Sequence, residues 1–303
     1  MFACHSKKGC TDPGSLSYDP EAKISDGNCQ YNSKELESQR LVTLDAFFRE
    51  NSALLYLENR LWTINDDPGE NYLYSIDLIT GKPREIIELE GVDNHDFESL
   101  ASDGEYIYIC DTGNNPGNRT DLAIYRIKII PENQLKPRMS VPAEKISYHF
   151  ADQTDFSRNT DNNLDGEGVI FYKGHLYIFT KNHGNNLCHL YKIPATPGHH
   201  AAHRIGVFNS NGLITGADID KDGKRIILCG YDKDINRTFL WLLEDFEEDK
   251  FFAARKKICY ETGPALKMGQ VEGVCFFRDN RVFISNEQWR GVPPSVYQLD
   301  LKN

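Results

Sequence analysis

The sequence predicts an all-β protein, a five-bladed β-propeller of four-stranded blades closed by a strand from the N-terminal region. Three observations predict this fold: a recurring segment, strand-like sequence behind each copy, and a last copy that lacks its fourth strand. Each recurring segment has a polar residue able to bind a cation, then a small residue, then an apolar strand. These five key residues are Ser52, Glu98, Glu167, Thr215 and Glu272, with spacings of 46, 69, 48 and 57 residues. Such spacings are typical of a propeller and not of a solenoid of short repeats.

Four strand-like runs make up each repeat. Behind Ser52 they are "LLYLEN", "RLWTIND", "YLYSIDL" and "REIIELEG", and behind Glu167 they are "GVIFYKG", "HLYIFTK", "LCHLYKIP" and "AHRIGVFN". The runs are rich in β-branched and aromatic residues and are bounded by Gly, Asn, Asp or Pro, as strands are. Four antiparallel strands in succession form one propeller blade.

The last repeat indicates how the ring of blades closes. After Glu272 only three runs follow, "GVCFFRD", "RVFISNE" and "SVYQLDL", whereas "SQRLVTLD" over residues 38–45 precedes the first repeat. A blade completed by this N-terminal strand would hide the edges of the sheet. Six blades are the alternative, because the 69-residue interval is long. Two blades would need about 90 residues at this period, so we interpret the extra length as an inserted loop.

Composition agrees with one propeller domain over residues 38–303. The chain has 303 residues, of which 40% are hydrophobic, enough to form a core of stacked sheets. Its net charge of −11 argues against a nucleic-acid partner. No run of 18 apolar residues occurs, so we expect membrane contact only through a lipid anchor. We expect the protein to be a monomer.

Residues 1–37 resemble the end of a bacterial lipoprotein signal followed by a polar tether. The segment "MFAC" places a small residue before Cys4, the pattern of a Cys that is cleaved and lipidated, although the charged and apolar parts of such a signal are absent. This interpretation predicts a lipid-anchored protein of the bacterial cell envelope, periplasmic or at the cell surface. An ordinary disordered start that contains Cys4 is the alternative. In an oxidising compartment Cys10 and Cys29 could form a structural disulfide.

Polar loops are predicted to gather on one face of the propeller. If each inner strand runs away from its key residue, the connection entering it lies at the same end as the loop between the second and third strands. These loops are rich in Asn and Gly and cover residues 65–71, 111–119, 181–186, 231–237 and 286–291. Functional residues on a rigid scaffold usually lie on such loops.

The five key residues predict a calcium site at this face. Three glutamates near a central channel would repel one another unless protons or a cation intervene. Calcium accepts six to eight oxygen ligands, so Glu98, Glu167 and Glu272, with the hydroxyls of Ser52 and Thr215, suit Ca²⁺ better than Mg²⁺. A water-filled channel whose carboxylates pair with Lys or Arg is the alternative.

The order Ser, Glu, Glu, hydroxyl, Glu, one per blade, resembles the calcium-activated apyrases, with Thr215 standing where that family has Ser. The resemblance implies a central calcium held by these five residues and hydrolysis of nucleoside di- and triphosphates. It covers the architecture and these positions, so it does not carry the chemistry with it. The segments "EGV" and "DFES" are also similar, more weakly, to uncharacterised bacterial propeller lipoproteins and to phytase-like and esterase-like propellers.

Several residues could act beside the ion. Lys181 and Arg119 are cations that could bind a phosphate, whereas Asp111, Asp165, Asp96 and His95 are candidate bases for activating water. Each also has an ordinary structural or solvated role, and they do not form a complete catalytic set. We therefore expect a calcium-dependent binding protein for a small anionic ligand, a glycan or a protein, with a calcium-dependent phosphohydrolase and a glycoside hydrolase as alternatives.

Two further motifs carry no predicted site. The segment "DIDKDG" from Asp218 copies the start of an EF-hand loop, but Cys229 stands where a bidentate Glu is required, which predicts a hairpin turn. The segment "PGHHAAH" places His199 and His203 four residues apart in what we expect to be a loop on the opposite face.

Overall fold

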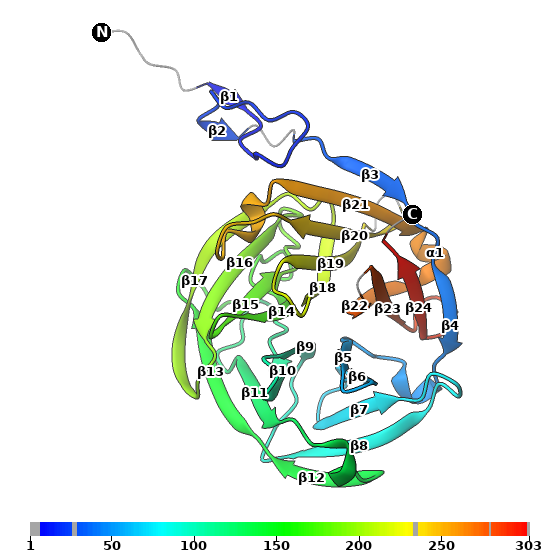
Figure 1. Ribbon diagram of the computed structural model, residues 1–303. Coiled ribbons are helices and arrows are strands. Elements are labelled where there is room, and N and C mark those ends of the chain that lie inside the picture. Colours follow the sequence, from blue (N-terminus) through cyan, green and yellow to red (C-terminus); the bar gives the residue numbers. More distant parts are fainter. Residues whose placement is uncertain (1–6, 26–28, 233–235, 279, 302–303) are drawn as a thin grey trace.

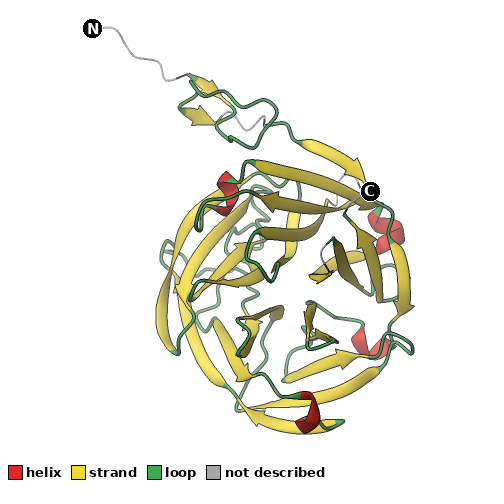
Figure 2. Cartoon of the chain, in the orientation of Figure 1, coloured by secondary structure: helices red, strands yellow, loops and turns green. Residues whose placement is uncertain are grey.

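The computed structural model describes residues 7–25, 29–232, 236–278 and 280–301 and is all-β, with its strands arranged around a centre (Figure 1). Helical structure in the described residues is limited to α1 (Ala265–Met268) and the 3₁₀ turns η1 (Ala46–Phe48), η2 (Glu132–Gln134) and η3 (Phe251–Ala253), all at the periphery (Figure 2). No helix in this part of the chain is long and apolar enough to cross a bilayer. The predicted all-β, propeller-like fold is confirmed.

Five antiparallel four-stranded units follow one another along the chain. Unit 1 is β5 (Leu55–Leu57), β6 (Arg60–Thr63), β7 (Tyr72–Ile76) and β8 (Pro83–Glu90); unit 2 is β9 (Phe97–Ser102), β10 (Tyr106–Asp111), β11 (Ala123–Lys128) and β13 (Glu144–Phe150); unit 3 is β14 (Gly166–Tyr172), β15 (His175–Thr180), β16 (Cys188–Pro194) and β17 (Gly198–Phe208). Unit 4 is β18 (Leu213–Ile219), β19 (Arg225–Asp232), β20 (Arg237–Glu244) and β21 (Lys256–Gly263); unit 5 is β22 (Gln270–Arg278), β23 (Arg281–Glu287), β24 (Ser295–Asp300) and β4 (Gln39–Thr43).

The N-terminal strand closes the last unit as predicted, because β4 pairs antiparallel with β24 in the register Ser295↔Thr43. The long interval between Glu98 and Glu167 contains β12 (Arg138–Pro142), which pairs in parallel with β8 of unit 1, and a loop over residues 151–165. Units 2 and 3 join into one eight-stranded sheet through parallel pairing of β13 with β17. A count of five blades therefore depends on treating this sheet as two blades that meet where β13 pairs with β17.

The inner strands of the units contact one another where the small residue of each repeat lies. Ser99 Oγ of unit 2 accepts a hydrogen bond from Val169 N of unit 3 at 2.9 Å. A methyl group on Gly168 would lie 2.7 Å from Ala217 Cβ of unit 4. A methyl group on Gly216 would lie 2.5 Å from the carbonyl oxygen of Glu272 in unit 5. The small residues are therefore required by close approach of neighbouring inner strands.

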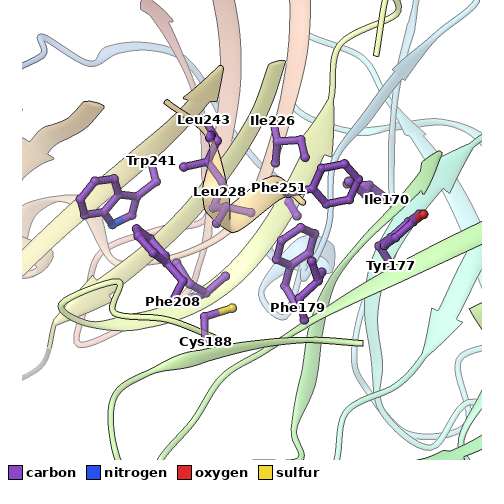
Figure 3. Packing of buried hydrophobic residues seen from close by; sticks show 14 of the residues in the cluster. Ile170, Tyr177, Phe179, Cys188, Phe208, Ile226, Leu228, Trp241, Leu243 and Phe251 are labelled. Carbon is purple, nitrogen blue, oxygen red and sulfur yellow. The ribbon is translucent and has the colours of Figure 1, made fainter. Parts of the chain in front are cut away.

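Buried apolar side chains form five clusters, each between two successive units. Successive residues of a strand point to opposite faces, so one strand can contribute to two clusters. In β19, Ile226 and Leu228 pack toward unit 3, whereas Ile227 and Cys229 pack toward unit 5. Figure 3 shows the cluster between units 3 and 4, where Phe208 meets Trp241 at a ring-centroid distance of 5.0 Å. The free cysteines of the described residues are buried in these strands, where a thiol packs as a small apolar group.

The described residues before 38, where the sequence predicts a polar tether, form short elements of structure. They include β1 (Lys8–Gly9), β2 (Ile24–Ser25) and β3 (Asn32–Glu35), and the Cys10–Cys29 disulfide is formed. Strand β3 pairs in parallel with β21 of unit 4, and Asp12 pairs with the buried Lys257. The boundary at residue 37 stays a prediction, and Cys4 lies outside the described residues.

Two turn predictions have different outcomes. Residues 220–224 form the predicted hairpin between β18 and β19, with Asp220 Oδ1 accepting from Lys224 N at 2.8 Å. The expectation that "PGHHAAH" is a loop is wrong, because β17 begins at Gly198 and pairs with β13. The parallel partner strand was not apparent from local sequence, which showed only flanking Gly and Pro.

Asp218 links units 4 and 5 and supplies a test of this packing. Its Oδ2 accepts a hydrogen bond from Phe276 N at 2.7 Å, and burial raises the pKa of Asp218 to about 7. This pKa lies above that of Asp218 in the unfolded chain. The contribution of Asp218 to the free energy of unfolding is therefore full below about pH 4 and is lost as the pH rises through about 7. Asn keeps an acceptor without titrating. Between pH 5 and pH 8 we therefore expect the free energy of unfolding to fall less in Asp218→Asn than in the wild type.

Urea unfolding at both pH values, with EDTA present, measures this difference. Asp222→Asn, at an exposed position of the neighbouring turn, is the control. Equal losses in the wild type and Asp218→Asn would show that Asp218 does not titrate in this range.

Candidate functional site

The five key residues all lie at the start of an inner strand or just before it, and all are buried. The key glutamates lie close enough for the charge of one to raise the pKa of another. Burial, followed by the charge of Glu167, raises the pKa of Glu98 well above its ordinary value. Burial likewise raises the pKa of Glu167 well above its ordinary value, despite the nearby Lys181, and Glu272 adds to the rise. Three units therefore place mutually repelling carboxyl groups at one end of the axis.

The two hydroxyls make hydrogen bonds between units. Ser52 Oγ donates to the carbonyl oxygen of Phe97 at 2.6 Å, and Thr215 Oγ1 donates to that of Val271 at 2.5 Å. Each acceptor residue directly precedes a key glutamate of the next unit. A hydroxyl that donates one hydrogen bond keeps lone pairs for an ion. The hydroxyls thus join neighbouring units, whether or not they also contact a cation.

Lys181 enters the same region from the end of β15. Its Nζ donates to Glu167 Oε1 at 2.9 Å, and the residue is only 7% exposed. Burial alone would lower the pKa of Lys181, but the charges of Glu167, Tyr231 and Glu272 raise it well above its ordinary value. Lys181 is therefore a charged partner of the key glutamates.

Further acidic side chains extend this group, and the sequence did not single out Glu50, Asp66 or Glu287. Burial, with the charge of Glu50 next, raises the pKa of Asp66 to about 7. Burial and the charge of Glu272 raise the pKa of Glu287 to about 9. Ligand atoms of Glu50, Asp66 and Glu287 lie within 4.8 Å of one another. Asp66 and Glu287 belong to loops that the sequence places on this face, which was the available signal.

Asp96 lies beside Glu98 and completes the group. Burial and the charge of Asp165 raise the pKa of Asp96 to about 6. A methyl group on Gly113 would overlap the Asp96 carboxylate and lie 2.8 Å from Glu98 Oε1, so both carboxylates approach the same backbone segment. We use the term central acidic cluster for the carboxylates and lysine assembled here: Asp66, Asp96, Glu98, Glu167, Glu272, Glu287 and Lys181.

Three of the predicted catalytic residues hold the loop after β10. Arg119 Nη1 contacts Asp111 Oδ1 at 3.0 Å, and Arg119 Nε contacts Asp121 at 3.0 Å. His95 Nδ1 lies 3.4 Å from Asp111 Oδ2. Asp111 is fully buried and also accepts from Asp96 N at 2.9 Å. Asp111, Arg119 and His95 therefore form one network at the edge of the central acidic cluster.

Asp165 holds units 2 and 3 together at the same end. It is fully buried and accepts a hydrogen bond from Asn114 N of the β10–β11 loop. His183 Nε2 lies 3.3 Å from Asp165 Oδ2, a contact that the sequence did not predict. The segment 181–186, which contains both Lys181 and His183, was the signal for it.

Fold and site together define a propeller-like all-β protein with a buried acidic cluster at one end of its axis. No protein-family model matches the sequence. Among solved structures, the chain is similar to hydrazine synthase of Kuenenia stuttgartiensis, with 9% identity, a TM-score of 0.34 and 94% of this chain covered. It is also similar to a Bacteroides uniformis protein described as a "putative 6-phosphogluconolactonase", with 12% identity, a TM-score of 0.37 and 80% of this chain covered.

The chain spans 59% of the hydrazine synthase chain and 66% of the Bacteroides uniformis chain. Neither protein is described as an apyrase. Similarity at this level carries no argument about ligand or activity, so the site itself must supply it.

Proposed function

We propose that this chain is a calcium-binding, propeller-like protein that presents the ion, at the acidic end of its axis, to a ligand or partner. One observation carries the proposal: Glu98, Glu167 and Glu272 come from three units and are buried together, with Lys181 as their partner cation. A single lysine offsets only part of the negative charge that these carboxyl groups carry when they are ionised. A bound dication would offset more of it at the same place.

The donor chemistry suits calcium. Carboxylate and hydroxyl oxygens are hard ligands, and Ca²⁺ accepts six to eight of them in flexible geometries. Glu167 Oε2 is buried and has no hydrogen-bond partner among the described residues. Lys181 would compete with the ion, because its ammonium group forms an ion pair with the other oxygen of Glu167. Residues Ser52, Glu98, Glu167, Thr215 and Glu272 remain the proposed ligands, with water in the remaining positions.

Binding is favoured over catalysis because the candidate catalytic groups already contact one another. Asp111 and Arg119 form an ion pair, Asp165 bonds across two units, and Lys181 bonds to Glu167. A small anion, a glycan or a protein segment with an acidic group would complete the coordination of the ion. Tethering to the bacterial cell envelope through Cys4 belongs to the same proposal.

A calcium-dependent phosphohydrolase is the second candidate, supported by the resemblance of the key residues to apyrases. Asp96 adds a specific observation, because its pKa of about 6 is close to that wanted in a general base at neutral pH. Glycoside hydrolysis would instead require one protonated and one ionised carboxyl group across a sugar. Phosphate release from nucleotides and sugar phosphates, with and without Ca²⁺, separates the phosphohydrolase from a binding protein.

Calcium titration of EDTA-stripped protein by calorimetry tests the proposal. We expect Glu167→Gln to weaken Ca²⁺ binding by about tenfold or more, because a charged ligand is lost. Glu144→Gln is the matched control, since Glu144 lies on an outer strand and pairs with Arg126 at the surface. Unchanged calcium affinity in Glu167→Gln, or the absence of binding in the wild type, would leave the salt-bridged channel as the better interpretation.

A further inference from the structure

Two histidines meet on the outer surface, on the parallel strands that join units 2 and 3. His149 Nδ1 of β13 lies 2.9 Å from His199 Nε2 of β17, and their ring planes are inclined by 17°. The register pairs Ser147 with His199 and His149 with Ala201. Figure 1 shows both strands on the outer rim, away from the inner strands β9, β14 and β22 that carry the three key glutamates.

The hydrogen bonds around the pair indicate which nitrogen carries a lone pair. Ser147 Oγ donates to the carbonyl oxygen of Gly198 at 3.2 Å and lies 3.1 Å from His199 Nδ1. Because the hydroxyl has one proton, it accepts from His199 Nδ1–H. His199 Nε2 is then unprotonated and accepts from His149 Nδ1–H. Ser147 therefore fixes the tautomer of His199 and directs its lone pair at His149.

His203 lies on the same outward face of β17. Alternation along the strand places His199, Ala201 and His203 on one side, and the bulge of β17 comes only after Arg204. His149 lies opposite Ala201, between the two histidines of β17. His149, His199 and His203 are all exposed, so an ion can reach them from solvent.

We propose that His149 and His199 bind a divalent transition-metal ion such as Zn²⁺, with His203 able to supply a third nitrogen. Zn–N bonds of about 2.0–2.1 Å in tetrahedral geometry place two ligand nitrogens about 3.3 Å apart. The present separation of 2.9 Å is only a few tenths shorter. On binding, His149 gives its Nδ1 proton to water and takes one on Nε2, so both rings stay neutral. The ion replaces the shared proton.

Calorimetric titration with ZnCl₂ tests the proposal. Excess Ca²⁺ is present to occupy the central acidic cluster, because calcium prefers oxygen ligands and does not compete for imidazole. We expect His149→Ala and His199→Ala each to abolish the zinc-binding phase that the wild type shows. His200→Ala is the matched control, since His200 is a neighbour in β17 whose Nε2 bonds to the Thr196 carbonyl at 2.8 Å. We expect Ser147→Ala to weaken zinc binding about tenfold.

A spectroscopic readout identifies the ligands directly. With Cu²⁺ in place of Zn²⁺, electron paramagnetic resonance is expected to show coupling to two or three nitrogens, and one fewer in His203→Ala if that residue binds. No zinc binding by the wild type, or equal binding in His149→Ala, His199→Ala and His200→Ala, would overturn the proposal. The pair would then be a hydrogen bond only. Circular dichroism checks that the variants are folded.

Discussion

Lys181→Met is expected to destabilise the calcium-free protein by about 3–5 kcal/mol, because it leaves a buried carboxylate without its partner. Lys181 Nζ lies 2.9 Å from Glu167 Oε1, and both side chains are withdrawn from water. Glu98 and Glu272 would also lose the attraction of this ammonium group. Met preserves much of the length and the apolar stem of Lys, so the loss of charge dominates. Urea unfolding in EDTA measures the effect.

Calcium separates the two interpretations of the central acidic cluster in this variant. If the ion binds among the key glutamates, removing a competing cation should strengthen calcium binding, and saturating Ca²⁺ should restore most of the lost stability. Lys192→Met is the control, because Lys192 pairs with Asp249 where both side chains are 29% exposed. Destabilised Lys181→Met protein that Ca²⁺ leaves unchanged would indicate a channel neutralised by Lys181 alone.

The inner strands could be predicted because their constraint is local in sequence. Neighbouring inner strands approach so closely that the position after each key residue must be small, as Gly168 and Gly216 show. This constraint recurs once per unit and produces the repeated segment. The closing strand β4 could be predicted for a related reason, since the last repeat visibly lacked a fourth strand.

Contacts that depend on parallel pairing between distant segments could not be predicted. Strand β12 was expected to be part of an inserted loop, yet it extends the sheet of unit 1 by pairing with β8. Strand β3 extends unit 4 in the same way. Neither strand has a recurring sequence signal, because the path of the chain between the units, and not local sequence, determines which outer strand it pairs with. The pairing of His149 with His199 has the same origin.

The candidate site was predictable in position but not in detail. The start of each inner strand supplied the key residues, and the loops between second and third strands supplied Lys181. Whether Lys181 points at the glutamates or at solvent depends on side-chain geometry that spacing does not encode. Asp66 and Glu287 were missed for the same reason, because they join the central acidic cluster only when loops of units 1 and 5 converge.

The close approach of the inner strands predicts a compensating pair of substitutions. Gly168→Ala is expected to destabilise the protein by about 1–3 kcal/mol, because the new methyl group would overlap its neighbours in unit 4. That methyl group would lie 2.7 Å from Ala217 Cβ and 2.9 Å from Ala217 N. Removing the Ala217 methyl group relieves the first contact but not the second.

We therefore expect Gly168→Ala combined with Ala217→Gly to recover part of the stability lost in Gly168→Ala. The coupling between the two sites, measured by a double-mutant cycle in urea, should favour the double variant. Ala217→Gly alone should be mildly destabilising, since it removes a buried methyl group and adds backbone freedom. Strictly additive effects would mean that units 3 and 4 are not in contact at these residues. Gly168 directly follows Glu167, a proposed calcium ligand. A change in calcium affinity in the double variant would therefore show that the spacing between units 3 and 4 affects the geometry of the ion site.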